Sequence, residues 1–180
     1  MLQEYLSEKN KKILELETRR KIYELVKKYS GCHFRELERK SNLPTGVLQY
    51  HLNYLTKNEL IKQEKVGNNI CYFLNVLSEN WKLLSLLRQK NIRKIILFIL
   101  TNKNHYHLDI VRFTNLSPST VSWHLNKLIK NGIIAQAKEG RKTNYKLLID
   151  EKEIIRLLIS YKESFFDSLV NKTIEMWEIK

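Results

Sequence analysis

The sequence contains LPTGVLQYHL at residues 43–52 and LSPSTVSWHL at residues 116–125. In both stretches a proline stands at or beside the point where a helix would begin, and apolar residues recur at helical spacing after it. The two stretches are offset by 73 positions, and the match extends from them in both directions. The pair therefore indicates that one structural unit occurs twice in the chain.

The duplication covers a whole unit. Shifted by 73 positions, residues 20–75 align without a gap onto residues 93–148, and eighteen of the 56 pairs are identical. A chance likeness of composition would not keep register over that length. The sequence therefore predicts two copies of one fold.

Each copy predicts the same order of elements. A first helix precedes a short extended segment and a brief second helix, which ends near Asn42 or Asn115. A third helix ends at 58–59 or 131–132, where a left-handed residue suits its C-terminus. In the second copy Ser117 is placed to cap this helix with Pro118 at its first position, whereas Pro44 stands in the place of Ser117 in the first copy. A hairpin follows in each copy, with turns at 67–69 and 140–142.

This order is that of a winged helix-turn-helix. The expected fold class is mainly α with small β-hairpin wings, as two tandem winged helix-turn-helix domains plus a linking helix and terminal helices. Its expected parts are an N-terminal helix at 1–17 that ends before a cap at Thr18, a first domain at 18–77, a linking helix at 78–90, a second domain at 91–149 and a C-terminal amphipathic helix at 150–180.

The stretches at 33–37, 43–52 and 116–125 resemble those of archaeal tandem winged-helix transcriptional regulators, in the broad group that includes the ArsR- and MarR-like repressors. The resemblance covers about residues 18–149. It implies the fold and DNA binding, and it does not indicate which genes are regulated.

Charge points to an anionic partner. The 180 residues include 32 Lys and Arg against 19 Asp and Glu, a net charge of +13. Such an excess attracts polyanions, nucleic acid first and anionic membrane surface second; the alternative is an idle lysine-rich surface. Residues 103–146 hold eight basic and two acidic residues, while 150–180 hold five and seven. The positive charge is therefore concentrated away from the tail.

The sequence predicts neither a membrane span nor a signal peptide. Its longest apolar run, residues 95–100, is six residues long, whereas a span needs roughly 20. The N-terminus lacks the basic and apolar zones of a secretory signal, so we expect a cytoplasmic protein.

We expect double-stranded DNA as the partner, with the third helix of each copy in a major groove. The inward stripes of these helices are expected to be Leu48, Leu52 and Leu55, and Val121, Leu125 and Leu128. The polar residues opposite, together with the wings, are the candidate DNA contacts. They are Thr45, Gly46, Gln49, Tyr50, Asn53, Lys57, Lys65 and Asn68 in the first copy, and Ser117, Ser119, Thr120, Ser122, Trp123, Asn126, Lys127, Lys130, Arg141, Lys142 and Thr143 in the second.

Two kinds of side chain on these helices allow two interpretations each. His51 and His124 border the inward stripe, which favours packing over a phosphate contact. Tyr50 and Trp123 occupy equivalent positions, where an aromatic ring could contact sugar or a thymine methyl, or pack on a neighbouring domain.

The two wings differ in charge. Arg141 and Lys142 are expected at the tip of the second wing, where they could enter a minor groove. The first wing, at 67–69, has no charge at its tip. We therefore expect the second domain to hold DNA more strongly; alternatively, the first domain serves mainly in dimerisation or ligand response.

Other chemistries find little support. His105 and His107 with nearby Asp109 would supply two nitrogens on one face of a strand, which does not complete a tetrahedral metal site. Strand pairing could bring Cys32 and Cys71 together as a redox switch, although cysteines are also common as small buried apolar residues. The chain lacks a phosphate-binding glycine loop and a nucleophile elbow, so we expect no enzyme, no cofactor and no metal.

The apolar spacing of the last segment, 151–177, predicts one long amphipathic helix. Its apolar face must be covered, and we expect a homodimer through this helix, because a two-fold operator suits a two-fold protein. The alternative is that the helix caps its own chain. An alternative for the whole protein is a winged-helix protein–protein module of the transcription or replication machinery.

Overall fold

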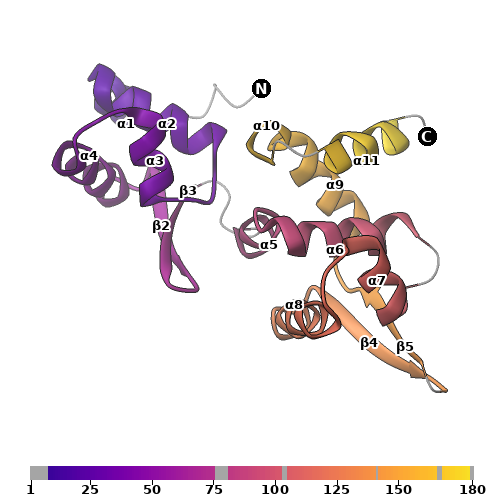
Figure 1. The fold of residues 1–180 in the computed structure, drawn as a ribbon. Helices are drawn as coiled ribbons and strands as arrows, with labels where there is room; N and C mark the ends of the chain where they lie inside the picture. The colour runs from indigo at the N-terminus through magenta and orange to yellow at the C-terminus, as the bar shows by residue number, and fades with distance from the viewer. Residues whose placement is uncertain (1–7, 76–80, 103–104, 141, 166–167, 179–180) are drawn as a thin grey trace. The chain divides into compact units, whose positions relative to one another are not determined.

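The structure is a computed structural model that describes residues 8–75, 81–102, 105–140, 142–165 and 168–178. The chain divides into two compact units, Met1–Trp81 and Lys82–Lys180. In each unit a bundle of helices carries one antiparallel β-hairpin (Figure 1).

The first unit contains helices and strands in the order expected for a winged helix-turn-helix. Its elements are α1 (Glu8–Leu14), α2 (Glu17–Lys28), β1 (Cys32–His33), α3 (Phe34–Ser41), α4 (Thr45–Lys57), β2 (Ile61–Val66) and β3 (Asn69–Leu74). Both β1 and β2 pair antiparallel with β3, which gives the sheet order β1-β3-β2.

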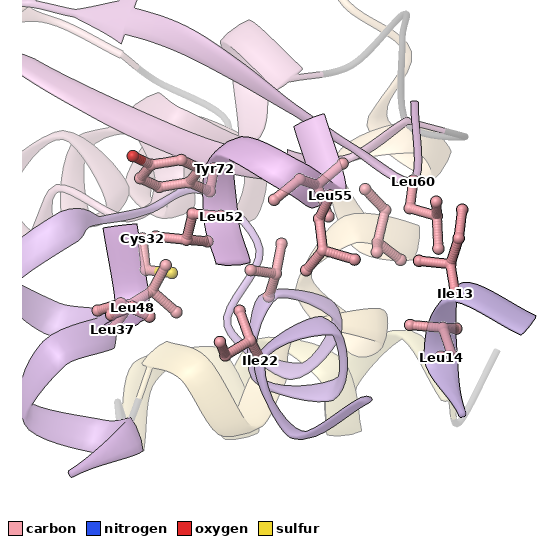
Figure 2. Packing of buried hydrophobic residues seen from close by; sticks show 13 residues of the cluster. Ile13, Leu14, Ile22, Cys32, Leu37, Leu48, Leu52, Leu55, Leu60 and Tyr72 are labelled. Carbon is pink, nitrogen blue, oxygen red and sulfur yellow. The ribbon is translucent and has the colours of Figure 1, made fainter. Parts of the chain in front are cut away.

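A continuous apolar core joins these elements (Figure 2). Ile22 of α2, Leu37 of α3 and Leu52 of α4 are all fully buried in it. Tyr72 of β3 and Leu60 close the core against the hairpin. Fully burying an aliphatic side chain contributes about 1.5–3 kcal/mol, so this cluster fixes how α4 is seated.

The second unit has the same plan, extended by helices at both ends. Its elements are α5 (Trp81–Leu87), which starts at the last residue of the first unit, α6 (Lys90–Thr101), α7 (His107–Thr114), α8 (Pro118–Lys130), β4 (Ile134–Glu139), β5 (Lys142–Leu147), α9 (Glu151–Ser160), α10 (Lys162–Phe165) and α11 (Ser168–Glu178).

The duplication is visible residue by residue. The elements α6, α7, α8, β4 and β5 begin and end 73 positions after α2, α3, α4, β2 and β3. Even the bridge between Tyr106 and Asn144 repeats the β1–β3 pair of His33 with Cys71. The structure thus confirms the predicted fold class, a mainly helical chain of two tandem winged helix-turn-helix domains with small hairpin wings.

The helix ends follow from particular residues. Asn42 and Asn115, with φ of 54° and 55°, end α3 and α7 in the left-handed conformation that asparagine tolerates. The hydroxyl of Ser117 accepts a hydrogen bond from the Thr120 amide at 3.2 Å, so its predicted capping role is confirmed. The predicted cap at Thr18 is wrong, because α2 begins one residue earlier and Leu16 precedes it.

The wing turns are shorter than predicted. Val66 pairs with Asn69 and Glu139 with Lys142, so each turn has two residues and Lys142 lies on strand β5 rather than at the tip. The reason is the glycine that opens each turn. Gly67 and Gly140 have φ of 62°, the left-handed value that closes a two-residue hairpin.

The tail is not one helix. The segment folds as α9, α10 and α11, and α11 packs against both α6 and α9. A straight helix could not bring its end back against its own start, so the prediction of a single amphipathic helix is wrong. Ile154, Leu158, Val170 and Ile174 are buried in this arrangement. These four apolar side chains are thus covered within the chain, which is what the capping alternative expects.

A buried arginine links the tail to the domain. Only 3% of Arg93, on α6, is exposed. Its guanidinium donates hydrogen bonds to the carbonyl oxygens of Leu87 at 2.7 Å, Arg88 at 3.3 Å and Phe165 at 3.5 Å. The side chain therefore ties the end of α5 and the end of α10 to α6.

Within the described part of the chain, no helix combines the length and apolar character that crossing a membrane requires.

Candidate nucleic-acid interface

Helix α4 presents the predicted polar face to solvent. Leu48, Leu52 and Leu55 are fully buried beneath it. The residues predicted to contact DNA from this helix are all exposed, and they are Thr45, Gly46, Gln49, Tyr50, Asn53 and Lys57. The structure therefore brings the six together on one accessible surface.

Helix α8 presents the matching face of the second unit. Val121, Leu125 and Leu128 are buried as predicted. The exposed residues are Ser117, Ser119, Trp123, Asn126 and Lys130, while Thr120, Ser122 and Lys127 are half-buried. The arrangement of an exposed ridge above a buried stripe is the one that a groove-binding helix requires.

Polar groups of the α4 face are bonded to each other and to α3. The Gln49 side-chain amide donates to the Asn53 side-chain oxygen at 2.9 Å. The Thr45 hydroxyl donates to the Glu38 carboxylate on α3. These bonds fix the direction of the side chains that the sequence places on this face.

Several of the predicted contacts in the second unit have partners within that unit, of which the sequence revealed only the cap at Ser117. Ser117 caps α8. The Ser122 hydroxyl lies 2.9 Å from Nε2 of His107, on α7. The Lys127 ammonium donates to the Gln89 side chain at 2.9 Å and lies 5.3 Å from the centre of the Trp123 ring. These side chains help to position α8 as well as lying along it.

The two histidines pack beneath the two exposed aromatics. His51 and His124 are each 8% exposed, whereas Tyr50 is 58% and Trp123 60% exposed. Burial lowers the pKa of both histidines below the usual 6.5, and the nearby charges of Arg19 and Lys127 lower it further. The packing interpretation of these histidines is therefore the one that the structure supports.

The wing of the first unit has little available positive charge. Lys65 and Asn68 are exposed, as a DNA contact requires. Lys62 forms an ion pair with Glu64 at 3.4 Å and lies over the Trp81 ring, 5.4 Å from its centre. The positive charge of Lys62 is thus partly committed within the unit.

The wing of the second unit is more basic. Lys138, Lys142 and Lys146 are all exposed along it, and Thr143 is half-buried. The Lys142 ammonium lies 4.9 Å from the centre of the Tyr106 ring, which holds it over the face of the hairpin. Arg141, the other cation predicted here, lies outside the described residues.

Two further basic residues beside α4 were missed by sequence reasoning. Arg35 and Arg39 are exposed on α3, four residues apart and hence on one side of that helix. The helix before a recognition helix crosses the DNA backbone in helix-turn-helix complexes, so these arginines are candidate phosphate contacts. Their i, i+4 spacing was the available signal.

The two histidines and the two cysteines considered for metal or redox chemistry lie in other arrangements than those chemistries need. The His105 ring is bonded to the Asn102 carbonyl, and His107 belongs to α7 rather than to a strand. No group of three metal-ligating side chains occurs within the described ranges. Cys32 lies opposite Tyr72 and Cys71 opposite His33. Because neighbouring residues of a strand alternate between faces, the two cysteines point to opposite sides of the sheet.

Comparison with known families now decides the kind of protein. Residues 16–82 match a family described as an N-terminal HTH domain, and residues 88–135 match a family described as winged helix-turn-helix DNA-binding. The chain is a tandem winged helix-turn-helix protein. The two family matches fall on the two copies that the repeat defines.

Relatives of this tandem winged helix-turn-helix protein carry regulator names. A protein of Methanocaldococcus jannaschii, named as an uncharacterized HTH-type transcriptional regulator, is 34% identical over 134 residues, which are 74% of this chain and 34% of that protein. A second, from Bacillus subtilis and named likewise, is 33% identical over 66 residues, 37% of this chain and 29% of its own length. The chain spans about a third of the length of these curated relatives.

Among solved structures, the DIP2311 protein of Corynebacterium diphtheriae aligns with 77% of this chain and 27% of its own, at 11% identity and a TM-score of 0.32.

Proposed function

We propose that this protein is a sequence-specific double-stranded DNA-binding transcriptional regulator. Helices α4 and α8 enter major grooves, and the wings lie on the minor groove or the backbone. The observation that carries the proposal is the repetition: two helices offset by 73 residues present the same polar face over the same buried stripe. The net charge of +13 suits a polyanionic partner.

The exposed faces of α4 and α8 each carry one group suited to contacting bases and one suited to contacting phosphate. Asn53 and Asn126 hold equivalent exposed positions, and an asparagine amide can pair with both groove-edge groups of adenine. Lys57 and Lys130 lie in the last turns of the two helices, where an ammonium group reaches phosphate. Base contacts then give sequence preference, and lysine contacts give affinity.

The second domain is proposed to hold DNA more strongly. Its wing has three exposed lysines, whereas the first wing has Lys65 and an uncharged tip. Counterion release makes each neutralised phosphate count toward affinity. The first domain would contribute sequence preference more than binding strength.

The test is a titration of duplexes selected from random DNA, followed by fluorescence anisotropy at several salt concentrations. If the protein neutralises 6–10 phosphates, its affinity should fall by about 10³–10⁵ between 50 and 200 mM salt. Selection of no preferred sequence, or an affinity that ignores salt, would contradict the proposal. The second result would favour a protein–protein module instead.

Two substitutions on α8 separate the two tasks. Asn126→Ala should cost about 1–3 kcal/mol on the selected sequence and relax its preference at one position. Lys130→Ala should weaken binding on all sequences alike and lower the salt slope by about 1. If both variants bind as the unchanged protein does, α8 does not enter the groove.

Homodimerisation through the C-terminal segment remains a prediction. Ile154, Leu158, Val170 and Ile174 of α9 and α11 are covered within the chain, while Ile159 and Met176 stay 43% and 55% exposed. Sedimentation velocity on the protein with and without its selected duplex would give the number of chains in the complex.

A further inference from the structure

One aromatic ring stands in the middle of each recognition-helix face. Tyr50 and Trp123 occupy positions offset by 73 residues and expose 58% and 60% of their surface. In α4 the neighbours of Tyr50 include the polar or small residues Gly46, Asn53 and Lys57, together with Val47, which is 40% exposed, and Tyr54, whose ring centre lies 6.5 Å away. In α8 the neighbours of Trp123 include Ser119, Asn126 and Lys130. The two copies use different aromatic residues, so the ring itself is the shared feature.

Each ring is held in the same way. The ring centres of Tyr50 and His51 lie 5.0 Å apart at an interplanar angle of 72°, and those of Trp123 and His124 lie 4.8 Å apart at 73°. This is the edge-to-face arrangement that aromatic rings favour. The histidines are buried, so they form a fixed support from which the aromatic rings project.

Each histidine ring is buried on the side of its Nδ1 atom. Among the described residues, Nδ1 of His51 and Nδ1 of His124 are both buried without a hydrogen-bond partner. Burial also lowers the pKa of both side chains, which keeps them uncharged at neutral pH. The support beneath each ring is therefore a neutral, rigid one.

The chemistry of the major groove restricts what such a ring can contact. The base edges there are hydrogen-bond donors and acceptors, except for the C5-methyl group of thymine. The carbon atoms of an aromatic ring placed on the polar edges would remove water from them without replacing the hydrogen bonds, and only the Tyr50 hydroxyl and the Trp123 indole N–H could bond there. Contact with a thymine methyl instead buries apolar surface on both sides.

We propose that Tyr50 and Trp123 determine specificity by contacting thymine C5-methyl groups in the major groove, with His51 and His124 as positioning residues. The inference rests on the proposed function. Asn53 and Asn126 stand three residues further along the same faces, where an amide suits adenine. Each recognition helix therefore presents an adjacent pair of groups suited to thymine and adenine, and its preferred sites should contain both bases.

The experiment compares duplexes that contain thymine or deoxyuridine, which differ only in the methyl group. On the selected duplex, replacing each thymine in turn should lower the affinity of the unchanged protein by about fourfold at each contacted position, the value of one buried methyl group. This measurement uses only the unchanged protein, so a misfolded variant cannot account for its result.

Matched variants assign the discrimination to the rings. Trp123→Ala and Tyr50→Ala should each bind thymine and deoxyuridine equally well at one position of the site, whereas Trp123→Phe and Tyr50→Phe should keep the difference. Leu148→Ala is the control, because Leu148 is 62% exposed and follows β5 at the end of the hairpin opposite the wing turn. It should leave the discrimination unchanged.

The positioning role has its own measurement. His124→Gln should reduce the thymine–deoxyuridine ratio at the Trp123 position while the salt slope stays the same, since phosphate contacts do not depend on the ring. A ratio that stays unchanged would overturn the role of the histidine.

Each remaining outcome decides between the two claims. Equal affinity of the unchanged protein for thymine and deoxyuridine duplexes overturns this inference and leaves the proposed function standing. Absence of duplex binding overturns the proposed function. Loss of self-association in Trp123→Ala, measured by sedimentation velocity, would assign the ring to a protein interface and also overturn the inference.

Discussion

The two domains share one backbone plan and differ in the side chains that face solvent. In the first, the exposed amides of Gln49 and Asn53 on α4 are bonded together and the wing tip is uncharged. In the second, a serine caps the recognition helix and lysines line the wing. The comparison shows that buried positions and turns preserve the fold, while the copies differ in their exposed side chains.

The identities between the copies support this division. Leu52 and Leu125 are buried in their cores, and Asn42 and Asn115 are left-handed helix ends. Gly67 and Gly140 open the two wing turns. In the wing turns, by contrast, the alignment pairs Asn68 of the first copy with Arg141 of the second.

The largest effect should come from the cores. Leu52→Ala and Leu125→Ala each remove a buried side chain and should lower the free energy of unfolding of their own domain by about 2–5 kcal/mol. If the units fold independently, hydrogen exchange in each variant should rise in one copy only. Equal loss of protection in both copies would contradict independence.

The repeat made much of the fold predictable. Buried leucines at helical spacing, asparagine at the helix ends and glycine at the turns are local signals, and each occurs twice. Because the two copies align without a gap, each helix and strand expected in the first copy predicts one 73 residues later in the second. The exposed face of α4 followed directly from its buried stripe.

What the sequence did not reveal depends on contacts between distant residues. Nothing in residues 151–177 shows that the tail turns back onto α6, since its apolar spacing suits a straight helix as well. The hydrogen bond between His107 and Ser122 and the one that Lys127 donates to Gln89 join residues far apart in the chain. The faces of Cys32 and Cys71 followed only once the strand register was known.

The wings offer the next test of the comparison. Lys142→Ala should lower the salt slope of DNA binding by about 1, because it removes one phosphate contact. Asn69 holds the equivalent place in the first wing, so Asn69→Ala is the matched control and should leave the slope alone. Asn69→Lys should raise the slope by about 1 if the first wing also lies on DNA. An unchanged salt slope in Lys142→Ala would contradict the proposal that the second domain binds DNA more strongly than the first.

Gly46 tests how closely α4 approaches its partner. A methyl group added there would meet nothing within 4 Å, so Gly46→Ala should stabilise the first domain by up to about 1 kcal/mol. Contact with DNA at this position should nevertheless make the same variant bind more weakly. Thermal unfolding and anisotropy measure the two effects, with Ser119→Ala as the counterpart in α8. A stabilised variant with unchanged affinity would show that α4 stays clear of the groove wall.

The smallest effect concerns pH. The pKa of His51 and of His124 lies below the usual 6.5 in the folded protein, so the unfolded chain binds protons first as pH falls. The free energy of unfolding should therefore decrease as pH drops from 6.5 toward the lowered folded values. Urea unfolding at pH 7.5 and 5.0 measures this, and His51→Gln with His124→Gln should flatten the profile. A profile equally steep in the double variant would assign the dependence to other groups.

Arg20 and Arg93 occupy equivalent positions in the two copies. Arg20 is exposed, whereas Arg93 is buried and donates a hydrogen bond to the Phe165 carbonyl at the end of α10. In the second copy the terminal helices bury this arginine, and its guanidinium joins them to α6. A chain that ended with the repeat, at residue 148, would expose Arg93 and the apolar side of α6 that α11 covers. The smallest autonomous second half must therefore extend past Ile174, well beyond the limit that the duplication alone would suggest.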